Sequence, residues 1–279
     1  MRDLYIIHGW TYSTAPWDKT LALLKKQGIT VHMLRVPGLT SPSDKTFTIS
    51  DYVSWAQSHL PADCVVLGHS NGGRILLNLL ADSAQNSSRE PTGVKGARSK
   101  VPTKPVENSP FHHLILLASA GIYEPSKKRD FFRSVSKLLS PLKNLPLLRQ
   151  VAHKLLGASD YSRAPENMKH TLSNMLDSDR ALTPDRLKTI TTPTSILWGA
   201  ADTTTPLRMG QKLHSLLPHS TLEVHDSWTH APYISDPEGL AASILNILDR
   251  LDTAKKPAKP SKKSEKPSSK PSNSPKGLA

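Results

Sequence analysis

Residues 64–74 read Cys-Val-Val-Leu-Gly-His-Ser-Asn-Gly-Gly-Arg, and this stretch decides the fold. Residues 64–67 form a short apolar run, which is typical of a buried strand. Apolar residues at positions 75, 76, 77, 79 and 80 then continue as the apolar face of a helix. A strand that turns directly into a helix around a central Ser is the nucleophile-elbow arrangement. The stretch therefore predicts that Ser70 lies at the tip of a sharp strand-to-helix turn.

Three glycines fit this turn. Gly68 and Gly72 lie two residues either side of Ser70, where the strained backbone leaves no room for a Cβ atom. Gly73 lets the helix begin close to the strand. The pattern G-x-S-x-G also occurs by chance on loops, but the strand before it, the helix after it and the third glycine favour a catalytic serine. Its hydroxyl would stand above the sheet at the positive end of the helix dipole.

The rest of the chain alternates between strand and helix patterns. Apolar runs near residues 4, 31, 65, 115, 196 and 222 predict six strands. Helical patterns separate them, among them residues 16–26, residues 51–59 with Ser50 as the N-cap, 207–217 and 237–251. This alternation predicts an α/β fold with a mostly parallel sheet of about six strands, flanked by helices on both faces.

Composition shifts divide the chain. Residues 1–121 and 185–252 are expected to form the α/β core. Residues 83–110 are rich in Ser, Pro, Lys and Gly, which predicts a flexible insertion. Residues 122–184 have no strand pattern and alternate apolar with basic residues in helical fashion, so they are expected to form a helical lid. Residues 253–279 consist mainly of Lys, Pro and Ser, which predicts a disordered tail.

The formal net charge of +13 is distributed unevenly. Eight Lys and one Glu lie beyond residue 253, in the predicted tail. The basic balance is therefore weak evidence for nucleic-acid binding, and no specific nucleic-acid partner is expected. The basic tail or lid could make at most weak contact with an anionic surface. The N-terminus lacks a signal-peptide pattern and no apolar run is long enough to span a membrane, so a cytoplasmic protein is expected.

A serine hydroxyl needs a general base within hydrogen-bond reach, and that base needs an orienting acid. Asp202 and His230 each follow a predicted strand, where a parallel sheet collects its active-site groups. The chain order Ser70, Asp202, His230 favours Asp202 as the acid over Asp226, which precedes His230 by only four residues. His69, inside the elbow, is expected to pack beneath the turn.

An oxyanion hole needs two fixed N–H donors. The backbone N–H of Asn71, directly after the nucleophile, is one expected donor. The loop after the first predicted strand, His8-Gly9-Trp10, should supply the second, and the N–H of Trp10 is the candidate.

These pieces together resemble the α/β-hydrolase superfamily, of the kind with a helical cap. The matching motifs are His8-Gly9-Trp10, Gly68-His69-Ser70-Asn71-Gly72-Gly73, Leu197-Trp198-Gly199-Ala200-Ala201-Asp202 with Pro206, and His230-Ala231-Pro232. The resemblance implies an α/β-hydrolase fold with Ser70 as nucleophile, Asp202 as acid, His230 as base, and Trp10 and Asn71 as oxyanion donors. The sequence departs from the common pattern directly after the nucleophile, where relatives often have Met or Gln. Asn71 at this position is expected to make the pocket more polar.

The expected activity is that of a serine hydrolase without cofactor or metal, which cleaves a carboxylic ester or related acyl bond of a small to medium apolar substrate. Carbon–carbon bond hydrolysis or acyl transfer would use the same residues. A non-catalytic binding protein that kept the pocket is the rival from another class, and the complete set of three residues speaks against it.

Within the predicted lid, Phe131 and Phe132 begin an apolar stripe at helical spacing. Such a stripe usually packs on its own domain. The alternative interpretation is that it lines the acyl pocket, and on that reading Phe131 and Phe132 are substrate-binding residues.

Overall fold

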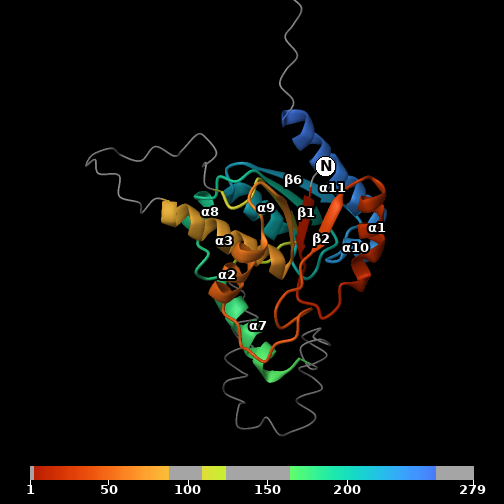
Figure 1. Cartoon of the computed structure of the whole chain (residues 1–279). Helices are drawn as coiled ribbons and strands as arrows, with labels where there is room; N and C mark the ends of the chain where they lie inside the picture. Colours follow the sequence, from red (N-terminus) through yellow and green to blue (C-terminus); the bar gives the residue numbers. More distant parts are fainter. Residues whose placement is uncertain (1–2, 88–108, 124–163, 256–279) are drawn as a thin grey trace, which may run out of the picture.

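The computed structural model describes residues 3–87, 109–123 and 164–255, and its centre is a six-stranded parallel sheet (Figure 1). The strands are β1 (Asp3–Ile7), β2 (Thr30–Met33), β3 (Val65–His69), β4 (His113–Leu117), β5 (Thr194–Gly199) and β6 (Ser220–His225). Their order across the sheet is β2-β1-β3-β4-β5-β6, and every neighbouring pair is parallel. The α/β fold class and all six strands predicted from the sequence are confirmed.

The strand order reverses direction at β1. The chain first moves from β1 to β2 at one edge, and then returns to place β3 on the other side of β1. Ligands in open parallel sheets bind at such a reversal, beyond the carboxyl ends of the strands. The loops that follow the neighbouring strands β1 and β3 carry Trp10 and Ser70, so two of the predicted site residues lie beside this reversal.

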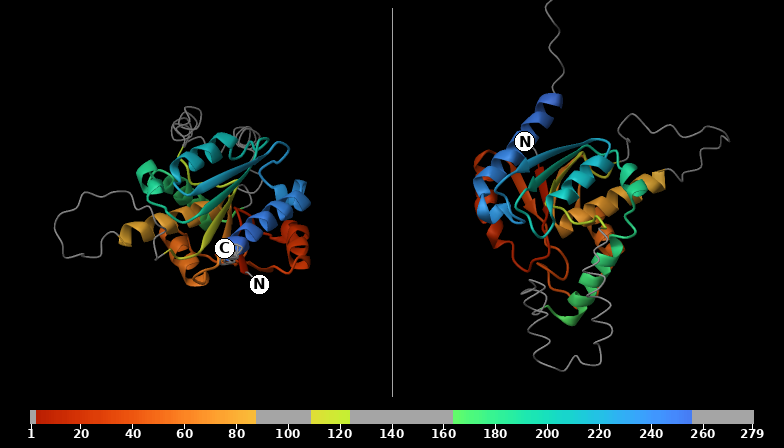
Figure 2. Two further views of the ribbon diagram at one scale, coloured as in Figure 1. Left: turned by 90° about the horizontal axis from the view of Figure 1, so that it is seen from above. Right: turned by 180° about the vertical axis from the view of Figure 1, so that it is seen from behind.

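Helices cover both faces of the sheet (Figure 2). On one face lie the 3-10 helix η1 (Ala15–Trp17), α1 (Asp18–Lys26), α10 (Pro232–Ser235) and α11 (Pro237–Lys255); on the other lie α2 (Ile49–His59), α3 (Asn71–Ser87), α8 (Pro184–Lys188) and α9 (Leu207–Leu216). Successive side chains of a strand point to opposite faces of the sheet, so the strands contribute to the apolar clusters on both faces. In β1, Leu4 and Ile6 join the cluster under α1 and α11, while Ile7 joins the cluster under α2 and α3.

Several boundaries differ from the sequence prediction. Helix α2 begins two residues earlier than predicted, and its N-cap is Thr48, so the assignment of Ser50 was wrong. The Thr48 side chain accepts a hydrogen bond from the Asp51 N–H while the Asp51 carboxylate accepts one from the Thr48 N–H. This reciprocal capping box satisfies two helix-end donors at once, which a lone Ser cannot do.

Two helices run into segments predicted to be irregular. Helix α3 continues to Ser87, so the first five residues of the expected insertion are helical, and α11 continues to Lys255, three residues beyond the expected core boundary. Residues 88–108 and 256–279 lie outside the described part of the chain.

The described part of the predicted lid contains helix α7 (Glu166–Ser178). Its polar side chains bind the loop before α2: Thr171 Oγ1 accepts from the Phe47 N–H at 2.9 Å, and Asn174 Nδ2 donates to the Phe47 carbonyl at 2.9 Å. Phe131 and Phe132 lie outside the described residues, so their role remains a prediction. Within the described ranges, no helix is long and apolar enough to cross a bilayer.

Gly72 is the glycine on which the elbow depends most. A Cβ atom at this position would lie 2.0 Å from the Ile7 carbonyl oxygen at the end of β1. Backbone cannot move aside as a side chain can, so Gly72→Ala is expected to lower the free energy of unfolding by about 3 kcal/mol, the upper part of the range for overpacked cores. Urea unfolding measures this loss.

Gly28→Asn is the matched control for that substitution. Gly28 has a φ of +78°, which Asn tolerates better than other residues, and a Cβ there meets no atom within 4 Å. This variant should stay within about 0.5 kcal/mol of the parent protein. Equal stability of the two variants would show that the elbow does not need a glycine at position 72.

Candidate active site

Ser70 occupies the turn between β3 and α3. Its φ is +50°, a left-handed conformation that is uncommon for residues other than glycine. Backbone hydrogen bonds hold the turn: the Ser70 N–H donates to the Leu117 carbonyl at 3.1 Å, and the Ser70 carbonyl accepts from the Ala120 N–H at 3.0 Å. Leu117 ends β4 and Ala120 lies in the loop after it, so the neighbouring strand and its loop fix the strained conformation that presents the hydroxyl.

The structure brings the predicted nucleophile, base and acid together at the carboxyl edge of the sheet. The Ser70 hydroxyl lies 3.0 Å from His230 Nε2 and can donate to it. On the other side of the ring, His230 Nδ1 donates to Asp202 Oδ2 at 2.9 Å. A carboxylate can only accept, which fixes the proton on Nδ1 and leaves Nε2 free to accept. Asp226, the competing candidate, is exposed in the turn after β6.

Asp202 is held by more donors than the sequence indicated. Its Oδ1 accepts from the backbone N–H groups of Thr204 and Thr205 at 2.8 and 2.9 Å. Its Oδ2 accepts from the Thr205 hydroxyl at 2.8 Å as well as from His230. Burial acts to raise the pKa of Asp202, but these hydrogen bonds and the charge of His230 outweigh it and lower the pKa. The acid is therefore ionised at neutral pH.

Thr205 also contacts Asp202 and His230, which the sequence did not reveal. Its hydroxyl lies 3.1 Å from His230 Nδ1 and 3.1 Å from the Ala118 carbonyl, in addition to Asp202. It thereby ties the end of β4 to the loop after β5. A hydroxyl residue three positions after the acid was the available signal, but nothing in the sequence showed which way that side chain turns.

His69 lies buried beneath the turn, as expected. Its Nε2 donates to the His230 carbonyl at 2.9 Å, and its ring packs edge-on against Trp17 and Tyr233. Burial first, and the neighbouring His230 second, lower the pKa of His69 to about 3. This imidazole therefore stays neutral in the folded protein and supports the loop that carries His230.

The lowered pKa of His69 makes stability depend on pH. As the pH falls below about 6.5, the unfolded chain takes up a proton on this residue before the folded chain does, so stability is complete above that pH and declines toward pH 3. His69 should contribute a slope of up to about 1.4 kcal/mol per pH unit. The free energy of unfolding, measured with urea between pH 7 and 4, should depend less steeply on pH in His69→Gln than in the parent protein. An unchanged slope would contradict the assignment. His8, whose pKa burial also lowers, adds to the slope of both proteins.

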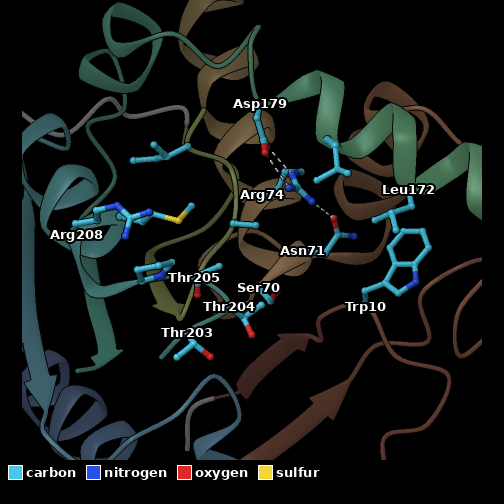
Figure 3. Close-up of a pocket in the computed structure, with 15 residues that line it drawn as sticks. Trp10, Ser70, Asn71, Arg74, Leu172, Asp179, Thr203, Thr204, Thr205 and Arg208 are labelled. Atoms are coloured by element: carbon cyan, nitrogen blue, oxygen red, sulfur yellow. Dashed lines mark hydrogen bonds and ion pairs between the residues drawn. The ribbon is translucent and has the colours of Figure 1, made fainter. Parts of the chain in front are cut away.

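A cavity of about 460 Å³ opens beside Ser70 (Figure 3). It is lined by Trp10, Ser70, Asn71, Arg74, Ala120, Ile122, Leu172, Leu176, Asp179, Thr203, Thr204, Thr205, Pro206, Arg208 and Met209. Both predicted oxyanion residues, Trp10 and Asn71, belong to its lining. The loop that carries Trp10 approaches the elbow closely, since a Cβ on Gly9 would lie 3.0 Å from the Ser70 Cβ.

A buried ion pair on the wall of the cavity was not predicted. Arg74 donates through Nε and Nη2 to the two carboxylate oxygens of Asp179, at 2.6 and 2.9 Å. Its Nη1 donates to Asn71 Oδ1 at 2.6 Å. Arg74 is 4% exposed and Asp179 is 6% exposed. A charged residue directly before the apolar face of the elbow helix was a visible signal, but its partner lies 105 positions away in the chain.

A second serine–histidine contact lies elsewhere. His113 Nε2 and Ser195 Oγ are 3.0 Å apart, both buried, near the amino ends of β4 and β5. This is the edge of the sheet opposite the cavity, so the contact joins two strands and does not form part of the site. Across the described ranges, no three His, Cys, Asp or Glu side chains are placed to hold a metal ion together.

Comparison of the sequence and the fold with known proteins identifies the family of this chain. The curated relatives include pimeloyl-[acyl-carrier protein] methyl ester esterases: that of Chromobacterium violaceum is 24% identical over 88% of this chain and 94% of its own, and that of Vibrio vulnificus is 22% identical over 88% and 93%.

Solved structures share the fold as well, and two of them serve as examples. They are MGS-MChE2, an alpha/beta hydrolase enzyme from a lagoon-sediment metagenome (18% identity, 90% of this chain and 92% of that one, TM-score 0.60), and the serine hydrolase CarC involved in carbazole degradation (18%, 90% and 92%, 0.56). The sequence profile described as the alpha/beta hydrolase family matches residues 4–243. The chain belongs to the alpha/beta hydrolase family.

Proposed function

We propose that this protein is a serine hydrolase that cleaves carboxylic esters or related acyl bonds of small to medium substrates through an acyl-enzyme on Ser70. The observation that carries the proposal is the hydrogen-bonded series Ser70–His230–Asp202, placed where Ser70 opens onto the cavity. Relatives named as esterases and membership of a hydrolase family support it.

The proposed reaction has two halves. His230 Nε2 takes the proton from Ser70 Oγ as the oxygen attacks the ester carbonyl, and Asp202 stabilises the imidazolium that forms. The backbone N–H groups of Asn71 and Trp10 would hold the oxyanion. The C–O bond to the alcohol then breaks and His230 protonates the leaving oxygen. Water, deprotonated by His230, attacks the acyl-enzyme, and the acid leaves as Ser70 regains its proton.

The relatives suggest which esters to test first. Their name specifies the methyl ester of an acyl group, so esters of short alcohols are the first class to examine here. Leu172, Leu176 and Met209 give the cavity apolar surface for an acyl chain, and its volume lies in the range of small-molecule sites. Phe131 and Phe132 stay proposed as further acyl contacts.

A panel of p-nitrophenyl and methyl esters of increasing acyl length tests the proposal. We expect a single optimum of kcat/KM at short to medium chains, because a cavity of about 460 Å³ limits the length of the acyl chain that it can hold. A diketone in the same panel tests carbon–carbon bond hydrolysis, and an added alcohol acceptor tests acyl transfer. Rates no higher than those of Ser70→Ala for every compound would overturn the proposal.

A further inference from the structure

The side chain of Asn71 is fixed in one orientation by a chain of charged hydrogen bonds. Asp179 holds the Arg74 guanidinium by two parallel contacts, and Arg74 Nη1 donates to Asn71 Oδ1 at 2.6 Å. Turning the amide over would place its NH₂ group against the guanidinium, donor against donor, so the oxygen must face Arg74. The amide nitrogen therefore points the other way.

That nitrogen has no acceptor among the residues that the structure describes. Asn71 is 3% exposed, and its Nδ2 is buried without a hydrogen-bond partner. Leaving a buried donor unpaired is unfavourable, so such a group calls for an acceptor, which a water molecule, an ion or a ligand can supply. The same Asn71 lines the cavity, and Figure 3 shows its amide nitrogen on the side of Trp10 and Leu172, which also line it. A bound molecule could supply the missing acceptor.

The position of Asn71 shows which part of a substrate would reach it. The leaving oxygen must lie near His230, which protonates it, whereas the cavity extends past Asn71 and Arg74 on the elbow helix. The acyl group thus occupies the cavity, and Asn71, directly after the nucleophile, borders the acyl atoms nearest the scissile carbonyl.

We propose that Asn71 Nδ2 donates a hydrogen bond to a second oxygen on the acyl group, close to the scissile carbonyl, and that such acyl compounds are the preferred substrate class. The acceptor is a neutral oxygen of a ketone or an ether. The charge of Arg74 is already matched by Asp179, so this wall of the pocket offers amide donors and no uncompensated cation. The inference rests on the proposed ester hydrolysis and specifies its substrate.

Matched pairs of esters test the inference. Each pair consists of two p-nitrophenyl esters of equal chain length, one with an ether oxygen in place of a methylene at the third, fourth or fifth position of the acyl chain. The quantity compared is the ratio of kcat/KM for the oxygen ester to kcat/KM for the methylene ester. Dividing the ratio of the parent protein by that of Asn71→Leu cancels the intrinsic reactivity of the esters. We expect a quotient of about tenfold or more at one oxygen position, the scale of one hydrogen bond to a buried donor.

A double variant provides a second readout. Arg74→Met with Asp179→Leu replaces the ion pair with apolar side chains, a change that buried pairs often tolerate. It frees Asn71 Oδ1, so the amide can rotate, and the preference for the oxygen ester should fall by a few-fold. If Asn71→Leu does not fold, as judged by its melting curve, this double variant decides the question.

The outcomes separate the two proposals. Hydrolysis of both esters with an equal ratio in the parent protein and the variants would overturn the role of Asn71 and leave the hydrolase intact. No hydrolysis of either ester, and no reaction of Ser70 with a fluorophosphonate, would overturn the proposed function and the substrate class with it.

Discussion

Ser70→Ala is expected to lower kcat/KM for the best ester by about 10⁴- to 10⁶-fold, the range seen when the nucleophile of such a triad is removed. The reason is geometric, because the Ser70 hydroxyl, which contacts His230 at 3.0 Å, is the proposed nucleophile. The folded structure should be unaffected, since the Ser70 backbone makes the hydrogen bonds that hold the turn. Steady-state kinetics with the ester panel measure the loss.

Ser195→Ala is the matched control. Ser195 is also within hydrogen-bond distance of a histidine, His113, but at the opposite edge of the sheet. Its substitution should leave kcat/KM within a few-fold of the parent value while costing about 1 kcal/mol of stability for the lost hydrogen bond. Loss of activity in Ser195→Ala with retention in Ser70→Ala would reverse the assignment of the site.

Asp202→Asn should have the second largest effect, a fall in kcat of about 10⁴-fold. The carboxylate fixes the proton on His230 Nδ1, so that Nε2 can accept from Ser70. An amide can instead present its NH₂ to Nδ1, which favours the tautomer with the proton on Nε2, where it faces the Ser70 hydroxyl. The effect should appear in kcat more than in KM, because the substrate cavity is unchanged.

Asp226→Asn is the control for that variant. Asp226 is exposed and follows β6 on the loop that carries His230, so its substitution should leave the rate nearly unchanged. Melting curves of both variants should show folded protein. If Asp226→Asn loses activity while Asp202→Asn retains it, the acid has been assigned to the wrong residue.

The elements of the fold could be predicted because each has a local signal. The run before Gly68 and the apolar face after Gly73 define the elbow within residues 64–80, and the other strands show the same short apolar runs. The residues at which helices and strands begin and end were harder to predict. The cap at Thr48 depends on reciprocal hydrogen bonds with Asp51, which only the folded chain shows.

Chain order was enough to nominate Ser70, Asp202 and His230, which the sheet brings together because each follows a parallel strand. Arg74 was visible as a charge beside the apolar face of the elbow helix, but no local signal indicated that Asp179 is its partner. The ion pair joins the elbow helix to the residue after α7, and the pairing depends on how α7 packs beside the core. The orientation of the Thr205 hydroxyl likewise depends on contacts with Ala118 and His230, which follow β4 and β6 and come close only in the folded chain.

Covalent labelling tests the central claim most directly. The folded protein is treated with a fluorophosphonate, digested, and the modified peptide is sequenced by mass spectrometry. The proposed mechanism predicts one adduct, on Ser70, which forms in the parent protein and in Ser195→Ala and is absent from Ser70→Ala. An adduct on another serine, or ester hydrolysis by a folded protein whose Ser70 stays unmodified, would contradict it.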